Sequence, residues 1–381
     1  MCRRSTVVLF FSFIFLAVGL SACGDSGLTP PTGGADASVD SGSADDAAPI
    51  DAAPARDVAD IDGNTGCNTA LGKLTVSAGY CVLAKVETTA SAFTFSGGTL
   101  WTYEQSGAAH KVLEWKFPAT NAPLDPAEDF FSFTPTGADV IYANSYLARS
   151  PSGLLAVGYN NDDFTSPSGK IIVGAKGKPP GAIEKANGNF SAVFWNDSTM
   201  LVNASGGVGK AQDGQGLYVH DKNNPEDSWK LIKGLGDASG FTLINNDVLF
   251  VGGYFYSDNS SKLFAFSRKA VKAAIDGQKV LDATTDGVLV YEGATLAATI
   301  LGNNLVLARA NESFAFSDIV FFPFTVGAGD KVALSETMQT VVTANDSGAN
   351  VTALGSDSGK LGVIFDLAGG KKYLTFFEKL L

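Results

Sequence analysis

The body of the chain repeats one pattern of apolar and polar positions. From residue 93 onward an apolar stretch meets a short turn of Gly, Asn, Asp or Ser, a second apolar stretch follows, and a third comes after a polar loop. Short apolar runs separated by such turns predict β-hairpins. The predicted turns recur at a regular spacing, at Gly97, Ser152, Asp197, Asp247, Asn303 and Ser347.

A repeat of about 50 residues with four short strands per unit is typical of a β-propeller. We therefore predict an all-β domain over residues 67–381, with six blades of about 52 residues or, as the alternative, seven of about 45. Strand-like segments at residues 73–87 and 371–381 are predicted to pair and close the ring. A pair of β-sandwiches is the other fold that such strands allow.

One segment, VLFVGGYFYSDNSSKLFAFS at residues 248–267, resembles a kelch blade. It has four apolar residues, then Gly252-Gly253 and an aromatic residue, and a second strand after a polar loop. The tryptophan usual in that second strand is missing, and Phe264 or Phe266 stands nearby. The resemblance covers this blade alone, so it implies a propeller blade without implying a particular kelch activity.

Composition agrees with a β fold that has a large core. Of the 381 residues, 45% are hydrophobic and 17% are charged, and Gly (43) and Phe (26) are abundant. Glycine with aromatic and β-branched residues favours turn-rich β structure. Residues 267–277 alone have the spacing of a helix, with Gly277 as its stop. The net charge of −12 argues against a nucleic acid partner.

The segment at residues 1–22 has the features of an export signal. Arg3 and Arg4 precede an apolar run at 6–20, and small residues follow it. The run is shorter than the roughly 20 apolar residues that span a bilayer. An uncleaved membrane anchor is the alternative.

The end of this segment, Leu20-Ser21-Ala22-Cys23, resembles the bacterial lipobox. The resemblance implies cleavage before Cys23, a diacylglyceryl thioether on its sulfur and usually an N-acyl chain. Two or three acyl chains hold a protein on a membrane permanently, whereas one holds it marginally. It thus implies a lipid-anchored protein of the bacterial cell envelope. Gly24, where an Asp would mark inner-membrane retention in enteric bacteria, favours the outer membrane.

Residues 23–66 are predicted to be a disordered acidic tether. From residue 24 they contain nine Asp and one Arg, no aromatic residue and few large aliphatic ones, so they cannot bury enough apolar surface to fold. The stretch from Asp60 to Asn64 is similar to the start of a calcium loop, but position 12 of that loop would be Leu71, where an EF-hand has Glu. Calcium is kept as an alternative, and no other metal or cofactor is predicted.

Two of the four cysteines, Cys67 and Cys81, remain once Cys2 is removed with the signal and Cys23 carries lipid. In an exported protein, two cysteines this close in sequence, without the CxxC spacing of a redox or metal pair, predict a disulfide. Closing a loop of this size stabilises a fold by about 3 kcal/mol in the chain-entropy model.

No residue is predicted to be catalytic. His110 and His220 fall at the ends of repeat strands, where we expect them to be exposed, and the sequence has no GxSxG motif to accompany them. Polar clusters that could hold a calcium ion or a sugar are Asn160-Asn161-Asp162-Asp163, Asp213, Asp221 and Asp258-Asn259. Four tryptophans are predicted to pack between sheets or to line a ligand funnel: Trp101, Trp115, Trp195 and Trp229.

These features favour a binding or scaffolding module for a protein or glycan partner. A propeller presents a broad loop face, and no catalytic motif stands out. The alternative is a sugar- or ester-processing enzyme with its site at the central channel. Convergent carboxylates or a metal at the channel mouth would favour the enzyme, and an apolar or aromatic loop face would favour binding.

Overall fold

The computed structural model describes residues 9–11, 14–16, 70–106, 109–117, 127–135, 142–143, 146–160, 168–221, 224–311, 315–328, 331–345, 349–367 and 370–379. The chain divides into two compact units, Met1–Asn64 and Thr65–Leu381. In the first unit the described residues form a hairpin of β1 (Leu9–Phe11) and β2 (Ile14–Leu16). None of the described helices is long and apolar enough to cross a membrane.

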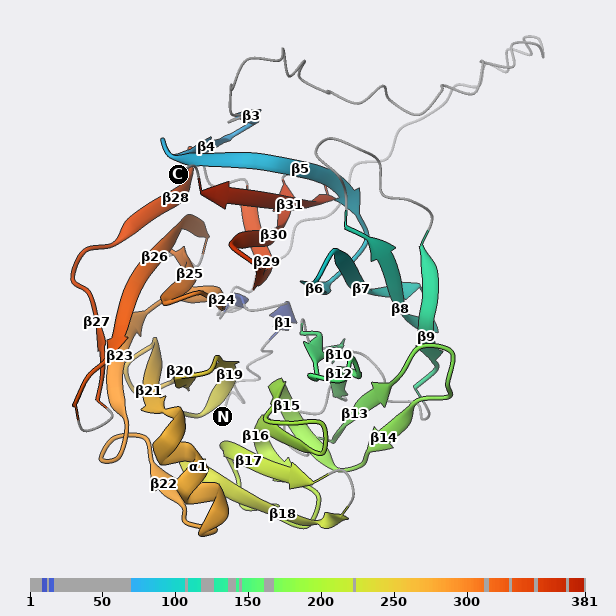
Figure 1. Ribbon diagram of the computed structural model, residues 1–381, viewed down its shortest axis with the longest axis vertical. Helices are drawn as coiled ribbons and strands as arrows, with labels where there is room; N and C mark the ends of the chain where they lie inside the picture. Colours follow the sequence, from blue (N-terminus) through green and yellow to red (C-terminus); the bar gives the residue numbers. More distant parts are fainter. Residues whose placement is uncertain are drawn as a thin grey trace, which may run out of the picture. The chain divides into compact units, whose positions relative to one another are not determined.

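The second unit is a six-bladed β-propeller, as predicted (Figure 1). Apart from the first strands of the unit, which join the outer edges of the last two blades, the strands of each blade follow sequence order from the centre outward. Blade 1 consists of β6 (Ala92–Ser96), β7 (Thr99–Ser106), β8 (Ala109–Lys116) and β9 (Glu128–Phe133). Blade 2 consists of β10 (Tyr142–Ala143), β12 (Leu155–Asn160), β13 (Gly169–Gly174) and β14 (Gly181–Ile183), with β11 (Ala148–Arg149) also paired to β12.

Blades 3 and 4 are linked by an inserted segment. Blade 3 has β15 (Ala186–Phe194), β16 (Thr199–Val208), β17 (Gly216–Asp221) and β18 (Asn224–Lys233), and β22 (Leu281–Asp282) joins its outer edge. Blade 4 has β19 (Ala238–Ile244), β20 (Val248–Phe255), β21 (Ser260–Ser267) and β23 (Val288–Gly293). The helix α1 (Arg268–Asp276) precedes β22, so this insertion reaches back from blade 4 to blade 3.

The last two blades take in the beginning of the unit. Blade 5 has β24 (Thr295–Leu301), β25 (Asn304–Ala310), β26 (Phe316–Val326) and β28 (Gln339–Ala344), extended by β4 (Leu74–Val76), β3 (Ala70–Leu71) and β27 (Val332–Leu334). Blade 6 has β29 (Ala349–Asp357), β30 (Lys360–Leu367) and β31 (Lys371–Lys379), with β5 (Tyr80–Thr88) as its outermost strand.

The predicted ring closure is confirmed. Strand β5 pairs antiparallel with β31, from Tyr80 opposite Lys379 to Thr88 opposite Lys372. The first long strand of the unit therefore completes the sheet made by its last three strands. This pairing joins blade 6 to the chain that enters blade 1, and the alternative of two β-sandwiches is wrong.

Six clusters of buried hydrophobic residues hold the ring together, one at each interface between neighbouring blades. Neighbouring residues of β20 show how this works: Leu249 packs toward blade 3, and Phe250 packs toward blade 5. Because a strand inside a blade is covered on both faces, its sequence is continuously apolar rather than alternating. The segment that resembles a kelch blade forms β20 and β21, and a Cβ at Gly252 would lie 2.2 Å from the carbonyl oxygen of Lys262.

Five of the six predicted turns connect the strands that we expected. Gly97, Asp197, Asp247 and Asn303 lie between the first and second strands of blades 1, 3, 4 and 5, and Ser152 lies between β11 and β12. The sixth prediction, Ser347, is wrong. It falls between β28 and β29, outside the described residues, whereas the turn of blade 6 is Ser358-Gly359, one full repeat after Asn303.

The predicted helix is confirmed as α1. Ser267 caps its start, where the Oγ atom accepts a hydrogen bond from the amide of Ala270 at 3.1 Å. Gly277 ends the helix, as the sequence indicated. The buried side chains of Val271 and Ala274 pack into the cluster between blades 3 and 4, so α1 extends the core of that interface.

Candidate functional site

The two histidines are buried, and the expectation that they are exposed is wrong. His110 lies near the start of β8 and His220 near the end of β17, and each side chain is 1% exposed. A neighbouring blade covers the face of each strand that carries the histidine, and the sequence of one strand does not reveal this. Burial lowers the pKa of both imidazoles, so both are neutral at pH 7.

Each histidine has one hydroxyl neighbour on Nδ1. His110 contacts the hydroxyl of Tyr103 and stacks on Phe133, with ring centroids 5.1 Å apart. The Nδ1 atom of His220 lies 2.9 Å from the Oγ atom of Ser228 on β18. Within the described residues, neither Nε2 atom has a hydrogen-bond partner.

The polar clusters that the sequence singled out are not brought together. Asn160 is buried at the end of β12, and its Nδ2 atom donates to the carbonyl oxygen of Asn189 at 2.9 Å. Asp213 belongs to a loop of blade 3, and Asp258 to a loop of blade 4, where it binds Lys262. Asn161, Asp162 and Asp163 lie outside the described residues. In the part of the chain that the structure describes, no three His, Cys, Asp or Glu side chains are grouped to hold a metal.

The innermost strands offer little charge at the centre of the ring. Along the described parts of β6, β10, β15, β19, β24 and β29, Asp357 is the one charged residue. Its carboxylate accepts a hydrogen bond from the amide of Gly97 at 3.2 Å, which ties the turn of blade 6 to that of blade 1. A carboxylate pair at the channel, which would have favoured an enzyme, is therefore not found among these residues.

Three of the four tryptophans have a structural partner. The indole of Trp101 donates to Glu114 and that of Trp115 donates to Thr102, both at 2.9 Å. Arg268 lies 4.6 Å from the centre of the Trp195 ring. Trp229 is different, because it packs against the cluster between blades 3 and 4 and also lines an open groove.

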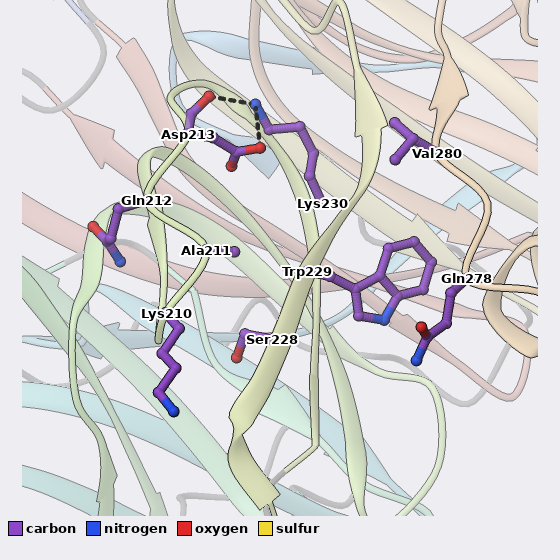
Figure 2. A pocket seen from close by; sticks show the side chains of 9 residues that line it. All are labelled: Lys210, Ala211, Gln212, Asp213, Ser228, Trp229, Lys230, Gln278 and Val280. Carbon is purple, nitrogen blue, oxygen red and sulfur yellow. Dashed lines mark hydrogen bonds and ion pairs between the residues drawn. The ribbon is translucent and has the colours of Figure 1, made fainter.

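This groove lies on the outer side of blade 3 and has a volume of about 530 Å³ (Figure 2). It is lined by three segments that are far apart in sequence: the loop Lys210, Ala211, Gln212 and Asp213, the β18 residues Ser228, Trp229 and Lys230, and Gln278 with Val280. Figure 2 shows Ser228 and Lys210 on one side of the β18 ribbon and Trp229, Gln278 and Val280 on the other.

The polar end of the groove is held by hydrogen bonds. The ammonium of Lys230 donates to the backbone carbonyl of Asp213 at 2.5 Å and lies 3.5 Å from the carboxylate of the same residue. The hydroxyl of Tyr218 donates to that carboxylate at 2.8 Å. Burial, together with the negative charge of Asp213, raises the pKa of Tyr218, so its proton stays in place. The loop is thus fixed to the sheet beneath it.

The outer edge of β18 pairs with β22 at one end of the strand. On one side β18 pairs with β17, and on the other β22 pairs with it at Ile232 and Lys233. The chain that leads into β22 passes Gln278 and Val280, which face the groove. The groove therefore lies beside the stretch of β18 that precedes its pairing with β22. Sequence reasoning named Asp213 and Trp229 but not this site.

The predicted covalent sites fall mostly outside the described residues. Cys23, the predicted lipid site, and Cys67 both lie there. Cys81 is in β5, opposite Glu378 of β31. The Cys67–Cys81 disulfide stays a prediction, and peptide mapping under non-reducing conditions would test it. The proposed calcium loop at Asp60 also lies outside the described residues.

Comparisons with known proteins identify the fold but no family. No protein-family model matches the chain, and no curated protein matches it. A glucose dehydrogenase structure matches with a TM-score of 0.51 and 10% identity, over 77% of this chain and 98% of the other. The PQQ-bound form of an aldose sugar dehydrogenase from Streptomyces coelicolor matches with a TM-score of 0.49 and 12% identity, over 80% of this chain and 98% of the other.

A glycosyl hydrolase from Bacteroides ovatus is more distant, with a TM-score of 0.38 and 10% identity over 77% of this chain and 84% of the other. The distant neighbours therefore include sugar dehydrogenases and a hydrolase. At such low identity the similarity shows the propeller fold alone.

Proposed function

We propose that this chain is a lipid-anchored protein of the bacterial cell envelope whose propeller binds a protein partner at the blade 3 groove. The observation that carries the binding role is the groove itself. It combines an indole ring, an exposed aliphatic side chain and fixed polar groups, on Trp229, Val280 and the Asp213–Lys230 pair. Aromatic anchors beside satisfied polar groups are typical of protein interfaces.

The rigidity of the groove supports the same role. Two of its walls are β18 and a loop that is fastened to the sheet by Lys230 of β18 and Tyr218 of β17. A site whose shape exists before the partner arrives loses less entropy on binding. The third wall, at Gln278 and Val280, follows directly from α1, whose buried face is part of the core.

Site-specific photocrosslinking in cells tests the binding role. A photoreactive amino acid in place of Gln278 should form a covalent adduct with a protein, and Val280→Asp in the same chain should remove that adduct. The matched control places the same amino acid at Leu289, which is 48% exposed on β23 and outside the groove. Equal adducts at both positions, or an adduct that survives Val280→Asp, would contradict the proposal. Binding of the purified protein to a glycan array, without any protein adduct, would instead identify a glycan partner.

The lipid anchor is tested separately. Cys23→Ala should move the protein from the membrane fraction to the soluble fraction of fractionated cells, because no acyl chain could then be attached. Metabolic labelling with a fatty acid analogue should mark the natural protein and not the variant. Retention of Cys23→Ala on membranes would show that the anchor proposal is wrong, and it would leave the groove proposal untouched.

One observation favours ester hydrolysis as a second candidate function. The hydroxyl of Ser228, which lines the groove, lies 2.9 Å from Nδ1 of the neutral His220. A serine beside a neutral imidazole is the arrangement that activates a nucleophile. A fluorophosphonate probe should then label Ser228 in the natural protein and not in His220→Gln. Absence of label at Ser228 would remove this candidate.

A further inference from the structure

We propose that the protein partner contributes an extended strand that adds to the outer edge of β18 within the groove. In this arrangement an apolar side chain of the partner packs against Trp229 and Val280, and an acidic side chain points toward Lys210. The inference rests on the proposed protein-binding function, and it specifies the conformation and chemistry of the bound segment.

The lining of the groove indicates that a ligand binds along the edge of the sheet rather than on one of its faces. Three consecutive residues of β18 line it: Ser228, Trp229 and Lys230. Successive side chains of a strand point to opposite faces, so a ligand that touches all three must lie alongside the strand. Figure 2 agrees, because lining side chains stand on both sides of the β18 ribbon.

The pairing of β18 supports the same geometry. This strand has ten residues, and among the described residues β22 pairs with its outer edge at Ile232 and Lys233. Strand β22 runs parallel to β18 there, so the edge already accepts a short added strand at one end. An extended polypeptide that pairs with an exposed sheet edge gains main-chain hydrogen bonds, while pockets for alternate side chains give specificity.

The two sides of the groove differ in chemistry, which predicts what the alternate side chains are. On one side the Trp229 ring and Val280, which is 46% exposed, form an apolar surface. On the other side stand Lys210 and Gln212, with the Asp213–Lys230 pair at one end. The charged residues of the lining are two lysines and one aspartate, in a chain whose net charge is −12. A lysine ammonium in the lining attracts an acidic side chain of the partner.

The test uses a phage-displayed library of random twelve-residue peptides, selected on the purified full-length protein. We expect enriched sequences in which apolar and acidic residues alternate. A synthetic copy of the best peptide, measured by fluorescence anisotropy, should bind Val280→Asp at least tenfold more weakly and Leu289→Asp within twofold of the natural protein. These two variants change residues that are similarly exposed, at 46% and 48%.

The decisive measurement is a pair of N-methylated peptides. Methyl groups on alternate backbone nitrogens block the hydrogen bonds of one edge of the peptide strand only. We expect one of the two registers to weaken binding about tenfold and the other to change it less than twofold. If both registers have the same effect while Val280→Asp still abolishes binding, strand addition is wrong and the proposed function stands. If no selected peptide depends on Val280, the protein-binding function itself fails.

Discussion

The inner and outer strands of blade 3 differ in their environment: the inner strand is buried against blade 2, and the outer strand lines an open groove. On the innermost strand, β15, Asn189 is fully buried and its side chain accepts a hydrogen bond from Tyr146 and donates to Asn160 and to the backbone of Ala186. The bonds with Tyr146 and Asn160 fasten blade 3 to blade 2. On the outermost strand, β18, Trp229 and Lys230 line an open groove. Blade 3 is thus fastened to blade 2 at its inner end, and its outer edge carries the proposed binding groove.

Loss of the hydrogen bonds made by the Asn189 side chain should have the largest effect on folding stability. Asn189→Ala leaves the hydroxyl of Tyr146 without its acceptor, whereas Asn160 keeps its bonds to the backbone of residue 189. An orphaned buried polar group costs about 1–3 kcal/mol. We expect the free energy of unfolding to fall by about 3 kcal/mol, measured by urea denaturation. The matched control is Asn350→Ala on β29, whose side chain is half-buried and bonds to the next backbone amide. Equal destabilisation by the two variants would mean that the inner contact is no stronger than a local one.

A second prediction concerns β17, which lies between β15 and β18 in blade 3. His220 of β17 has an ordinary pKa of 6.5, which burial lowers in the folded state, with a smaller opposite effect of Asp221. Below pH 6.5 the unfolded chain therefore takes up a proton that the folded chain does not. The free energy of unfolding should therefore have its highest value above this pH. It should decrease as the pH drops toward the lower pKa of the folded state. His220→Gln should flatten part of this slope in denaturation curves from pH 7.5 to 5. His110 affects the pH dependence of stability in the same direction, so the variant should keep part of the slope. An unchanged slope would mean that His220 does not contribute to it.

A smaller change is expected at the polar side of the groove. Lys210→Glu replaces a positive charge where an acidic side chain of the partner is proposed to lie. We expect about fivefold weaker binding of the selected peptide, with most of the difference lost in 1 M salt because exposed charges are screened. Folding stability should not change. The control Lys360→Glu, on β30 outside the groove, should leave affinity unaltered, and a salt-independent loss would argue against a charge effect.

The smallest effect should come from an exposed contact between blades. Lys176 of blade 2 forms ion pairs with Glu114 and Glu128 of blade 1, at 2.7 and 2.6 Å. All three side chains reach solvent, and exposed ion pairs add little to stability. Lys176→Ala should therefore leave the thermal midpoint within experimental error in a melting curve. A large decrease would mean that surface contacts hold the blades together as strongly as the buried amides do.

Local sequence patterns predicted most of the fold. Turn residues and apolar runs revealed the blade repeat, and Ser267 and Gly277 bound the helix as expected. The sixth turn was misplaced because Asp-Ser-Gly occurs twice in this part of the chain, at 346–348 and at 357–359, and nothing local distinguishes the two. The repeat length distinguishes them, because the second copy keeps the spacing between the turns of the other blades. Ring closure could be predicted because both end segments were strand-like and had no other partner in the repeat.

The site was harder to predict because it is assembled from distant segments. Asp213, Trp229 and Val280 come from a loop, an outer strand and an insertion of blade 4, and no spacing rule connects them. Burial of His110 and His220 was missed for a related reason. A neighbouring blade covers each histidine, and the sequence of a single strand carries no information about that neighbour.

The closure of blade 6 has a consequence for how the molecule forms. Tyr80 pairs with Lys379, so the first long strand of the ring has no partner until the last strand has been synthesised. Blades 1 to 5 are built mainly from consecutive hairpins, which form quickly because their contacts are local. The last blade cannot be completed until nearly the whole polypeptide has left the ribosome, and its loop-closure entropy is the largest of any sheet. Biogenesis therefore ends with this single step, and a chain truncated before β31 would keep a ring that cannot close.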